Sequence, residues 1–175
     1  GFWDCLDRAR RGIQIGLFSL RRWCNVPRWW RVLCALHTAA PGAKVGNPMY
    51  KTMIRQVVQA YSGKIVKTYI YLRFKIINPS ILEAMLSDFR PNRRALVLGC
   101  GFGLFDLILG LKWPEKTVRG VDINEGRLAA AREAALRLGV RNNTFEFMDL
   151  SRDDVRLGDC DEILLLDILH HVPPA

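Results

Sequence analysis

The carboxyl-terminal half of the chain alternates short apolar runs with segments that favour helix. Four short runs predict strands, at 95–98, 118–122, 144–148 and 162–167. The segments 104–112 and 126–138 lie between strands and are rich in Leu or Ala, so they predict helices. Strands that alternate with helices are typical of a doubly wound parallel sheet, here in the order 3-2-1-4. The predicted fold class is therefore α/β with a Rossmann-like parallel sheet.

The amino-terminal half shows helical spacing instead. Residues 49–77 lack proline and predict one long helix, although the alternation YLRFKI near its end leaves a strand there as an alternative. Pro79 begins a second helix that runs to about Phe89. The apolar or aromatic positions of the long helix are 54, 57, 58, 61, 65, 69 and 72. Because proline and glycine in 38–48 indicate a linker, we expect three regions: a basic aromatic arm over 1–40, a helical extension over 49–90 and a partial sheet domain over 91–175.

Charge divides the chain in the same way. Up to Arg94 the chain has seventeen basic and four acidic residues, a net charge of +13, and the remainder has nine basic and thirteen acidic residues, a net charge of −4. Within 21–31, three tryptophans are interspersed with four arginines. This composition suits an anionic lipid surface, RNA, or a helix packed on the core with a solvated basic face. We therefore expect an anionic membrane surface as a partner ahead of RNA.

Cysteine usage and hydropathy indicate the compartment. The five cysteines are far apart and form no CxxC pair, so neither a disulfide framework nor a metal site is predicted. The apolar run 13–20 is shorter than the roughly 20 residues that cross a bilayer. Arg21 and Arg22 follow it, where a signal peptide would have small residues. We expect a cytoplasmic protein, peripheral at most at the inner face of the membrane, and a trimmed chain because it begins at Gly1.

A glycine-rich loop and two carboxylates carry the candidate chemistry. The sequence LGCGFG at 98–103 lies between a predicted strand and a helix, where glycine permits a tight turn and the close approach of a ligand. Asp122 ends the next strand, nineteen residues after Gly103, and its carboxylate is placed to accept hydrogen bonds from ribose hydroxyls. Asp149 follows the third strand, where it can meet an exocyclic amine. Three consecutive strand ends thus predict a nucleoside site.

With these motifs, residues 80–175 resemble the class I S-adenosylmethionine-dependent methyltransferases. The resemblance implies that S-adenosyl-L-methionine is the cofactor, that Asp122 holds its ribose and that Asp149 meets its adenine. Val97 stands where the family commonly has an acidic residue. The positions implied to bind the cofactor are Gly99, Cys100, Gly101, Gly103, Asp122, Ile123, Asp149 and Leu150. The alternative for Cys100 is a small core residue.

The segment DEILLLDILHHVP at 161–173 resembles the fourth strand of that family and the turn after it. The resemblance implies that Asp167, His170 and His171 lie near the transferred methyl group. His170 or His171 would serve as a general base where the acceptor carries a proton. The alternatives are a buried structural histidine, a cap, and an aspartate that merely ends its strand.

Methyl transfer is the predicted activity, on an acceptor that the motifs do not specify. The basic half favours a lipid-like acceptor slightly ahead of small water-soluble metabolites, with RNA third. One alternative is a non-catalytic methyltransferase-like module that binds a partner or a membrane. A nicotinamide-dependent oxidoreductase is less favoured, because Leu104 stands where the GxGxxG motif needs its third glycine.

The predicted sheet has an exposed edge. Residues 163–166 are apolar on both faces and so require a neighbouring strand on each side, whereas the strand at 95–98 supplies only one. The family has seven strands, and strands 5 to 7 have no counterpart up to Ala175. We therefore expect the chain to be a partial enzyme that is poorly stable or self-associating by itself.

Overall fold

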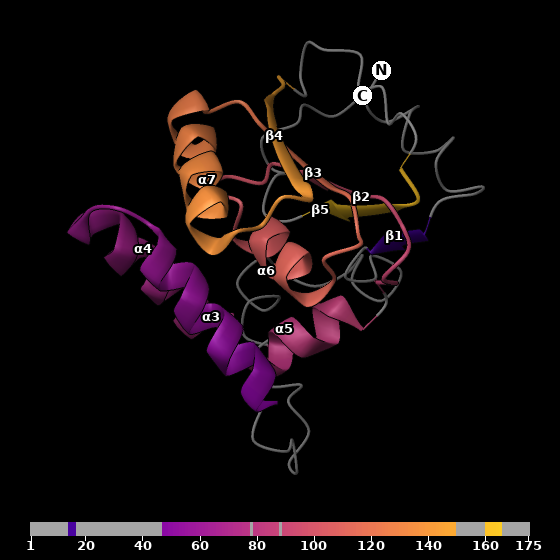
Figure 1. Cartoon of the computed structure of the whole chain (residues 1–175), viewed down its shortest axis with the longest axis horizontal. Coiled ribbons are helices and arrows are strands. Elements are labelled where there is room, and N and C mark those ends of the chain that lie inside the picture. The colour runs from indigo at the N-terminus through magenta and orange to yellow at the C-terminus, as the bar shows by residue number, and fades with distance from the viewer. Residues whose placement is uncertain (1–13, 17–46, 78, 88, 150–159, 166–175) are drawn as a thin grey trace, which may run out of the picture.

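The part of the chain that the structure describes contains one sheet of five parallel strands. The computed structural model describes residues 14–16, 47–77, 79–87, 89–149 and 160–165 (Figure 1). The strands are β1 (Gln14–Gly16), β2 (Ala95–Leu98), β3 (Val118–Asp122), β4 (Asn143–Phe147) and β5 (Glu162–Leu165). Their order across the sheet is β1-β5-β2-β3-β4, and every neighbouring pair is parallel. The four strands from β2 to β5 have the predicted 3-2-1-4 order, which confirms the α/β fold class.

The edge strand β1 was not predicted. It pairs in parallel with β5, with Ile15 opposite Ile163. The expectation of a bare edge along β5 is therefore wrong, because part of the amino-terminal arm covers it. The physical reason is that the backbone N–H and C=O groups of an exposed edge strand lack partners. Such an apolar strand therefore pairs with a suitable extended segment. The apolar run 13–20, which is too short to span a membrane, contains that segment.

The predicted long helix over 49–77 is two helices. They are α3 (Pro48–Ala60) and α4 (Lys64–Ile76), and Tyr61 between them is extended, with ψ 150°. Gly63 has a φ of +77°, a conformation that residues with a side chain rarely adopt, so the chain turns there. Asn47 caps α3, since its side-chain oxygen accepts a hydrogen bond from the backbone N–H of Met49 at 3.0 Å. The strand alternative near the end of this region is wrong, because α4 is helical throughout.

The break separates two helices that bury different positions of the apolar series listed for the predicted long helix. α4 packs Ile70 and Phe74 into the core, whereas Ile65, Tyr69 and Leu72, which belong to that series, are exposed. Val57 and Tyr61, which belong to the same series and precede the break, are buried. The spacing of apolar residues therefore identified the helical conformation correctly, but in α4 it does not mark the buried face.

Three further helices complete the described fold: α5 (Pro79–Leu86), α6 (Leu104–Lys112) and α7 (Glu125–Leu138). α6 and α7 each connect two neighbouring strands, as the alternating pattern predicted. The larger core cluster joins side chains of all five helices to one face of the sheet, including Val97 and Phe145. The opposite face contributes a smaller cluster of Leu96, Leu98, Val121 and Ile163. Successive residues of β2 thus alternate between the two faces.

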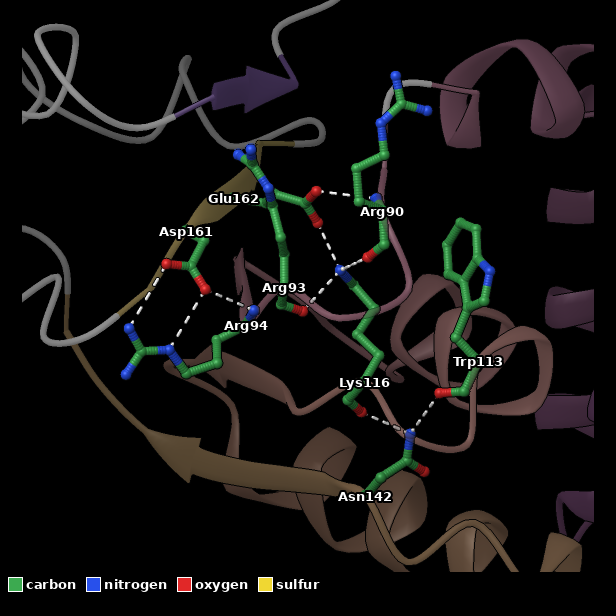
Figure 2. Close-up of polar contacts among 8 residues, drawn as sticks. All are labelled: Arg90, Arg93, Arg94, Trp113, Lys116, Asn142, Asp161 and Glu162. Carbon is green, nitrogen blue, oxygen red and sulfur yellow. Dashed lines mark hydrogen bonds and ion pairs between the residues drawn. The ribbon is translucent and has the colours of Figure 1, made fainter.

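A buried ion pair lies at the amino end of the sheet, where β2 and β5 begin (Figure 2). Lys116 is fully buried and donates from Nζ to Glu162, which begins β5 and is also buried. The same ammonium donates to the carbonyl oxygens of Arg90 and Arg93, both at 2.8 Å. The second carboxylate oxygen of Glu162 accepts from the backbone N–H of Arg90 at 2.9 Å. All three protons of the ammonium therefore have acceptors, which a buried charge requires.

Candidate functional site

The glycine loop at 98–103 connects the end of β2 to the start of α6. Its three glycines, Gly99, Gly101 and Gly103, have φ values of +66°, +57° and +70°. This alternating left-handed geometry is open to glycine and costly for other residues. The backbone N–H of Cys100 donates to the carbonyl oxygen of Val121 at 2.9 Å, which ties the loop to β3.

Asp122 connects the end of β3 to the glycine loop. One carboxylate oxygen accepts a hydrogen bond from the backbone N–H of Gly101 at 2.8 Å, and the other accepts from the N–H of Asn124 at 2.8 Å. Asn124 in turn caps α7 through the N–H of Arg127. A carboxylate has about four lone-pair positions, so each oxygen of Asp122 keeps capacity for another donor. The side chain of Ile123, the next residue, is exposed.

Gly101 and Gly103 meet different surroundings. A side chain at Gly101 would have no atom within 4 Å, so the loop faces open space at this position. A Cβ at Gly103 would lie 2.9 Å from Phe145 Cζ and 3.0 Å from Ala131 Cβ. Gly103 therefore permits close packing of the loop against β4 and α7, whereas Gly101 leaves room for a ligand.

The residues present fit a nucleoside cofactor. Gly101 provides open space beside the Asp122 carboxylate, which can accept hydrogen bonds from hydroxyl groups. The end of β4 lies next to Asp122, because the N–H of Met148 donates a hydrogen bond to the backbone carbonyl oxygen of Asp122 at 3.0 Å. Asp149 follows Met148, which brings the third predicted strand end to the same edge of the sheet.

Phe102 holds the loop against the amino-terminal helices, a contact that the sequence did not reveal. Its carbonyl oxygen accepts a hydrogen bond from the hydroxyl of Tyr61, the residue that follows α3. Its ring lies 6.3 Å from the Tyr61 ring in a T-shaped contact and 5.4 Å from the ring of Tyr69 on α4. The guanidinium of Arg127 lies 5.8 Å from the centre of the same ring. Helices outside the sheet domain therefore position the loop.

A second buried carboxyl group lies beneath the loop. Asp106, in the first turn of α6, is fully buried, and neither of its oxygens has a hydrogen-bond partner among the described residues. A side chain at Gly120 would collide with Asp106 Oδ1, so the carboxyl group lies directly against β3. Burial raises the pKa of Asp106 to about 8, and the charge of Asp122 adds to this shift. No sequence pattern indicated this group, since an acidic residue early in a helix is normally an exposed one.

Cys100 behaves as a core residue in this environment. Burial raises the pKa of its thiol, and the charges of Asp106 and Asp122 raise it further. The thiol therefore stays protonated near neutral pH and is a poor nucleophile. Its Sγ would lie 3.0 Å from a Cβ placed at Gly120, which shows how tightly β3 packs here.

The structure thus brings together most of the residues predicted to bind the cofactor. The glycine loop, Asp122 and Ile123 form one edge with the end of β4, and Asp149 follows that strand. Leu150 lies outside the described residues, as do the three predicted catalytic residues Asp167, His170 and His171. The tryptophan and arginine segment 21–31 also lies outside them.

Neither a metal centre nor a membrane-spanning helix is found in the part of the chain that the structure describes. No group of three or more His, Cys, Asp or Glu side chains there is arranged to hold a metal ion. No described helix is both long and apolar enough to cross a membrane.

Comparison with known proteins agrees with this geometry. The methyltransferase domain family matches residues 95–175, which begin at β2 and include the glycine loop. The resemblance inferred from the motifs is confirmed: residues 95–175 form a class I S-adenosylmethionine-dependent methyltransferase domain. The fold is accordingly one that binds S-adenosylmethionine or its demethylated product.

The similar proteins have names that describe different methyltransferases. Ubiquinone biosynthesis O-methyltransferase of Marinobacter nauticus is 34% identical over 86 residues, which are 47% of this chain and 34% of that protein. The 23S rRNA (uracil(1939)-C(5))-methyltransferase RlmD of Xanthomonas campestris is 34% identical over 123 residues, which are 58% of this chain and 26% of that protein. A solved structure of a SAM dependent methyltransferase from Aquifex aeolicus has 21% identity, a TM-score of 0.47 and coverage of 57% of each chain. The chain therefore spans about a third or less of the length of the two curated relatives.

Proposed function

We propose that this chain binds S-adenosylmethionine at the carboxyl ends of β2, β3 and β4 and takes part in methyl transfer to an acceptor. The observation that carries the proposal is the hydrogen bond from the N–H of Gly101 to Asp122, beside the open space over Gly101. The bond fixes the carboxylate of Asp122 at the edge of the loop, with acceptor capacity left for ribose hydroxyls.

Each predicted residue has a place in this proposal. Gly99, Cys100 and Gly101 would face the methionyl part, Asp122 would accept from the ribose, and Gly103 would keep the loop packed against Phe145. The adenine would lie between two pairs of consecutive residues. One pair is Asp122 and Ile123, and the other is Asp149 and Leu150.

The chemistry requires alignment more than acid–base catalysis. When bound, S-adenosylmethionine supplies a methyl group already activated by its sulfonium. The protein then has to hold the acceptor in line with that group and exclude water. Asp167, His170 and His171 are the residues that we propose beside the transferred methyl group. Where the acceptor carries a proton, one of the histidines would accept it.

For the acceptor, we propose a lipid-like or membrane-associated molecule ahead of small metabolites and RNA. The support is the net charge of +13 over residues 1–94, which favours an anionic surface over a neutral one. The names of the similar proteins include both a quinone pathway and RNA, so the family itself does not decide between these acceptors.

Titration calorimetry with S-adenosylhomocysteine tests the binding step. Asp122→Asn should weaken binding by roughly ten- to a hundredfold, because it removes charged hydrogen bonds to ribose hydroxyls and the charge that holds Gly101. Asp161→Asn is the matched control: it makes the same substitution at the amino end of the sheet and should bind as the wild type does. Binding of NADH without binding of S-adenosylhomocysteine would contradict the proposal, and so would equal affinities for wild type and Asp122→Asn.

A transfer assay separates the enzyme from a non-catalytic module. Labelled S-adenosylmethionine is incubated with the full-length protein and with lipid, RNA and small-molecule extracts. Label in the lipid fraction is the expected result. Tight binding of S-adenosylhomocysteine with no labelled product in any fraction would instead favour the non-catalytic alternative.

A further inference from the structure

Helix α4 exposes a stripe of apolar side chains on the side opposite its buried residues Ile70 and Phe74. Ile65, Tyr69, Leu72 and Ile76 are spaced by four, three and four residues, so they lie on one face of the helix. The exposed fractions are 87% for Ile65 and 55% for both Leu72 and Ile76. α4 lies at the periphery of the molecule (Figure 1). A contiguous exposed apolar stripe of this kind marks an interaction surface.

The stripe has a basic border and no acidic neighbour on its helix. α4 carries Lys64, Lys67, Arg73 and Lys75, and no Asp or Glu occurs anywhere from residue 8 to residue 82. On a helical projection Lys64 and Lys75 lie beside the stripe on one flank, and Arg73 lies on the other. A helix with an apolar face, a basic border and few acidic residues is typical of one that lies in a membrane interface.

Three other occupants fit this face less well. A second copy of α4 would bring like charges together, and so would residues 8–46, which include no Asp or Glu. RNA would satisfy the lysines but would leave the aliphatic Ile65, Leu72 and Ile76 in water. An anionic bilayer accepts both features, since its headgroups attract lysine and its acyl boundary takes up aliphatic side chains.

We infer that α4 docks this protein on an anionic lipid surface, with Ile65, Leu72 and Ile76 inserted at the acyl boundary. Lys64 and Lys75 would then lie at the headgroups. These residues belong to another part of the sequence than the tryptophan and arginine segment at 21–31.

Docking at α4 would also place the candidate site at the membrane. Tyr69 belongs to the stripe, and its ring lies 5.4 Å from the ring of Phe102 in the glycine loop. An acceptor that enters from the lipid surface would therefore reach the glycine loop directly beside α4. This consequence, unlike the docking itself, rests on the proposed function.

Vesicle sedimentation of the full chain tests the docking. One set of vesicles contains phosphatidylglycerol and phosphatidylcholine, and the other contains phosphatidylcholine alone. The wild type should bind the anionic vesicles with at least about tenfold preference, and the preference should shrink as salt is added. The triple substitution Ile65→Ser, Leu72→Ser and Ile76→Ser should weaken binding to anionic vesicles by about tenfold or more.

Leu136→Ser is the matched control, because Leu136 is 81% exposed on α7 and lies outside the stripe. It should bind vesicles as the wild type does. Thermal melts of the triple variant should match those of the wild type, since all three side chains are exposed. A triple variant that melts normally and still binds anionic vesicles with wild-type affinity would overturn the inference.

Two further outcomes would also overturn it. One is equal binding of the wild type to neutral and anionic vesicles. The other is that the wild type binds polyuridylate but no vesicles, and that the double variant Lys64→Glu, Lys75→Glu loses the polyuridylate binding. This result would assign the face to nucleic acid. Calorimetry with S-adenosylhomocysteine keeps the two proposals apart. Stripe-dependent vesicle binding by a chain that does not bind S-adenosylhomocysteine would support the docking and contradict the proposed function.

Discussion

Glu162 and Asp106 are two of the buried carboxyl groups among the described residues, and their surroundings differ sharply. Glu162 lies at the amino end of the sheet and is matched by the ammonium of Lys116 and the N–H of Arg90. Asp106 lies beneath the glycine loop, and its oxygens have no hydrogen-bond partner among the described residues. Burial raises the pKa of Asp106 to about 8, so this group folds in its neutral form near neutral pH.

The difference separates a structural region from a candidate binding region. At the amino end, the polar groups of the buried pair satisfy one another and connect three segments that are far apart in the sequence. At the glycine loop, Gly101 faces open space and Asp122 keeps acceptor capacity. Substitutions at the amino end should therefore change stability, whereas those facing the open space should change ligand binding.

Removal of the buried ammonium should have the largest effect. Lys116→Met leaves the Glu162 carboxylate buried without its cation, which should cost about 3 to 5 kcal/mol of unfolding free energy. Lys116→Met combined with Glu162→Gln should recover much of this loss, because the introduced amide is neutral and its oxygen still accepts from the N–H of Arg90. Urea unfolding of the wild type and the two variants measures both effects. A loss below about 1 kcal/mol in Lys116→Met would show that the pair is not a structural element.

The neutral form of Asp106 should make stability depend on pH. The folded chain keeps the proton of this group to about pH 8, whereas the unfolded chain loses it near the ordinary value of 3.8. The folded state therefore binds more protons between these values, so the unfolding free energy should fall as pH rises from about 4 to 8, by up to about 1.4 kcal/mol per pH unit. Asp106→Asn should remove most of this slope. An unchanged slope in the variant would mean that other groups cause it.

Two alanine substitutions within the loop should separate packing from binding. Gly103→Ala places a Cβ against Phe145 and should cost about 2 kcal/mol or more of stability. Gly101→Ala meets no atom and should cost only about 1 kcal/mol, from its positive φ. The new methyl group of Gly101→Ala should instead weaken S-adenosylhomocysteine binding. Equal stability losses in the two variants, measured by urea unfolding, would contradict this division.

The sheet domain was predictable from sequence because its signals are local. Each strand is a short apolar or alternating run beside a turn or helix signal, and the glycine loop and Asp122 hold fixed positions relative to strand ends. The strand order followed from that alternation together with the family resemblance. The predicted boundaries in this part of the chain differ from the observed ones by no more than two residues.

Contacts between distant segments were not predictable. Lys116 and Glu162 are 46 residues apart, and no pattern in either segment indicates their pairing. The same holds for Tyr61 and Phe102, and for the pairing of β1 with β5. The face that α4 buries depends on the turn at Gly63, and a continuous helical projection across that turn predicts the wrong face. In each case the deciding interaction is tertiary.

Hydrogen–deuterium exchange with and without S-adenosylhomocysteine compares the two ends of the sheet in one measurement. We expect the ligand to add protection of backbone amides at 99–104 and 122–127, around the glycine loop and the start of α7. We expect no change at 89–94 and 160–163, around the buried ion pair. Protection confined to the amino end of the sheet, or none at the glycine loop at saturating S-adenosylhomocysteine, would show that the glycine loop is not the binding region.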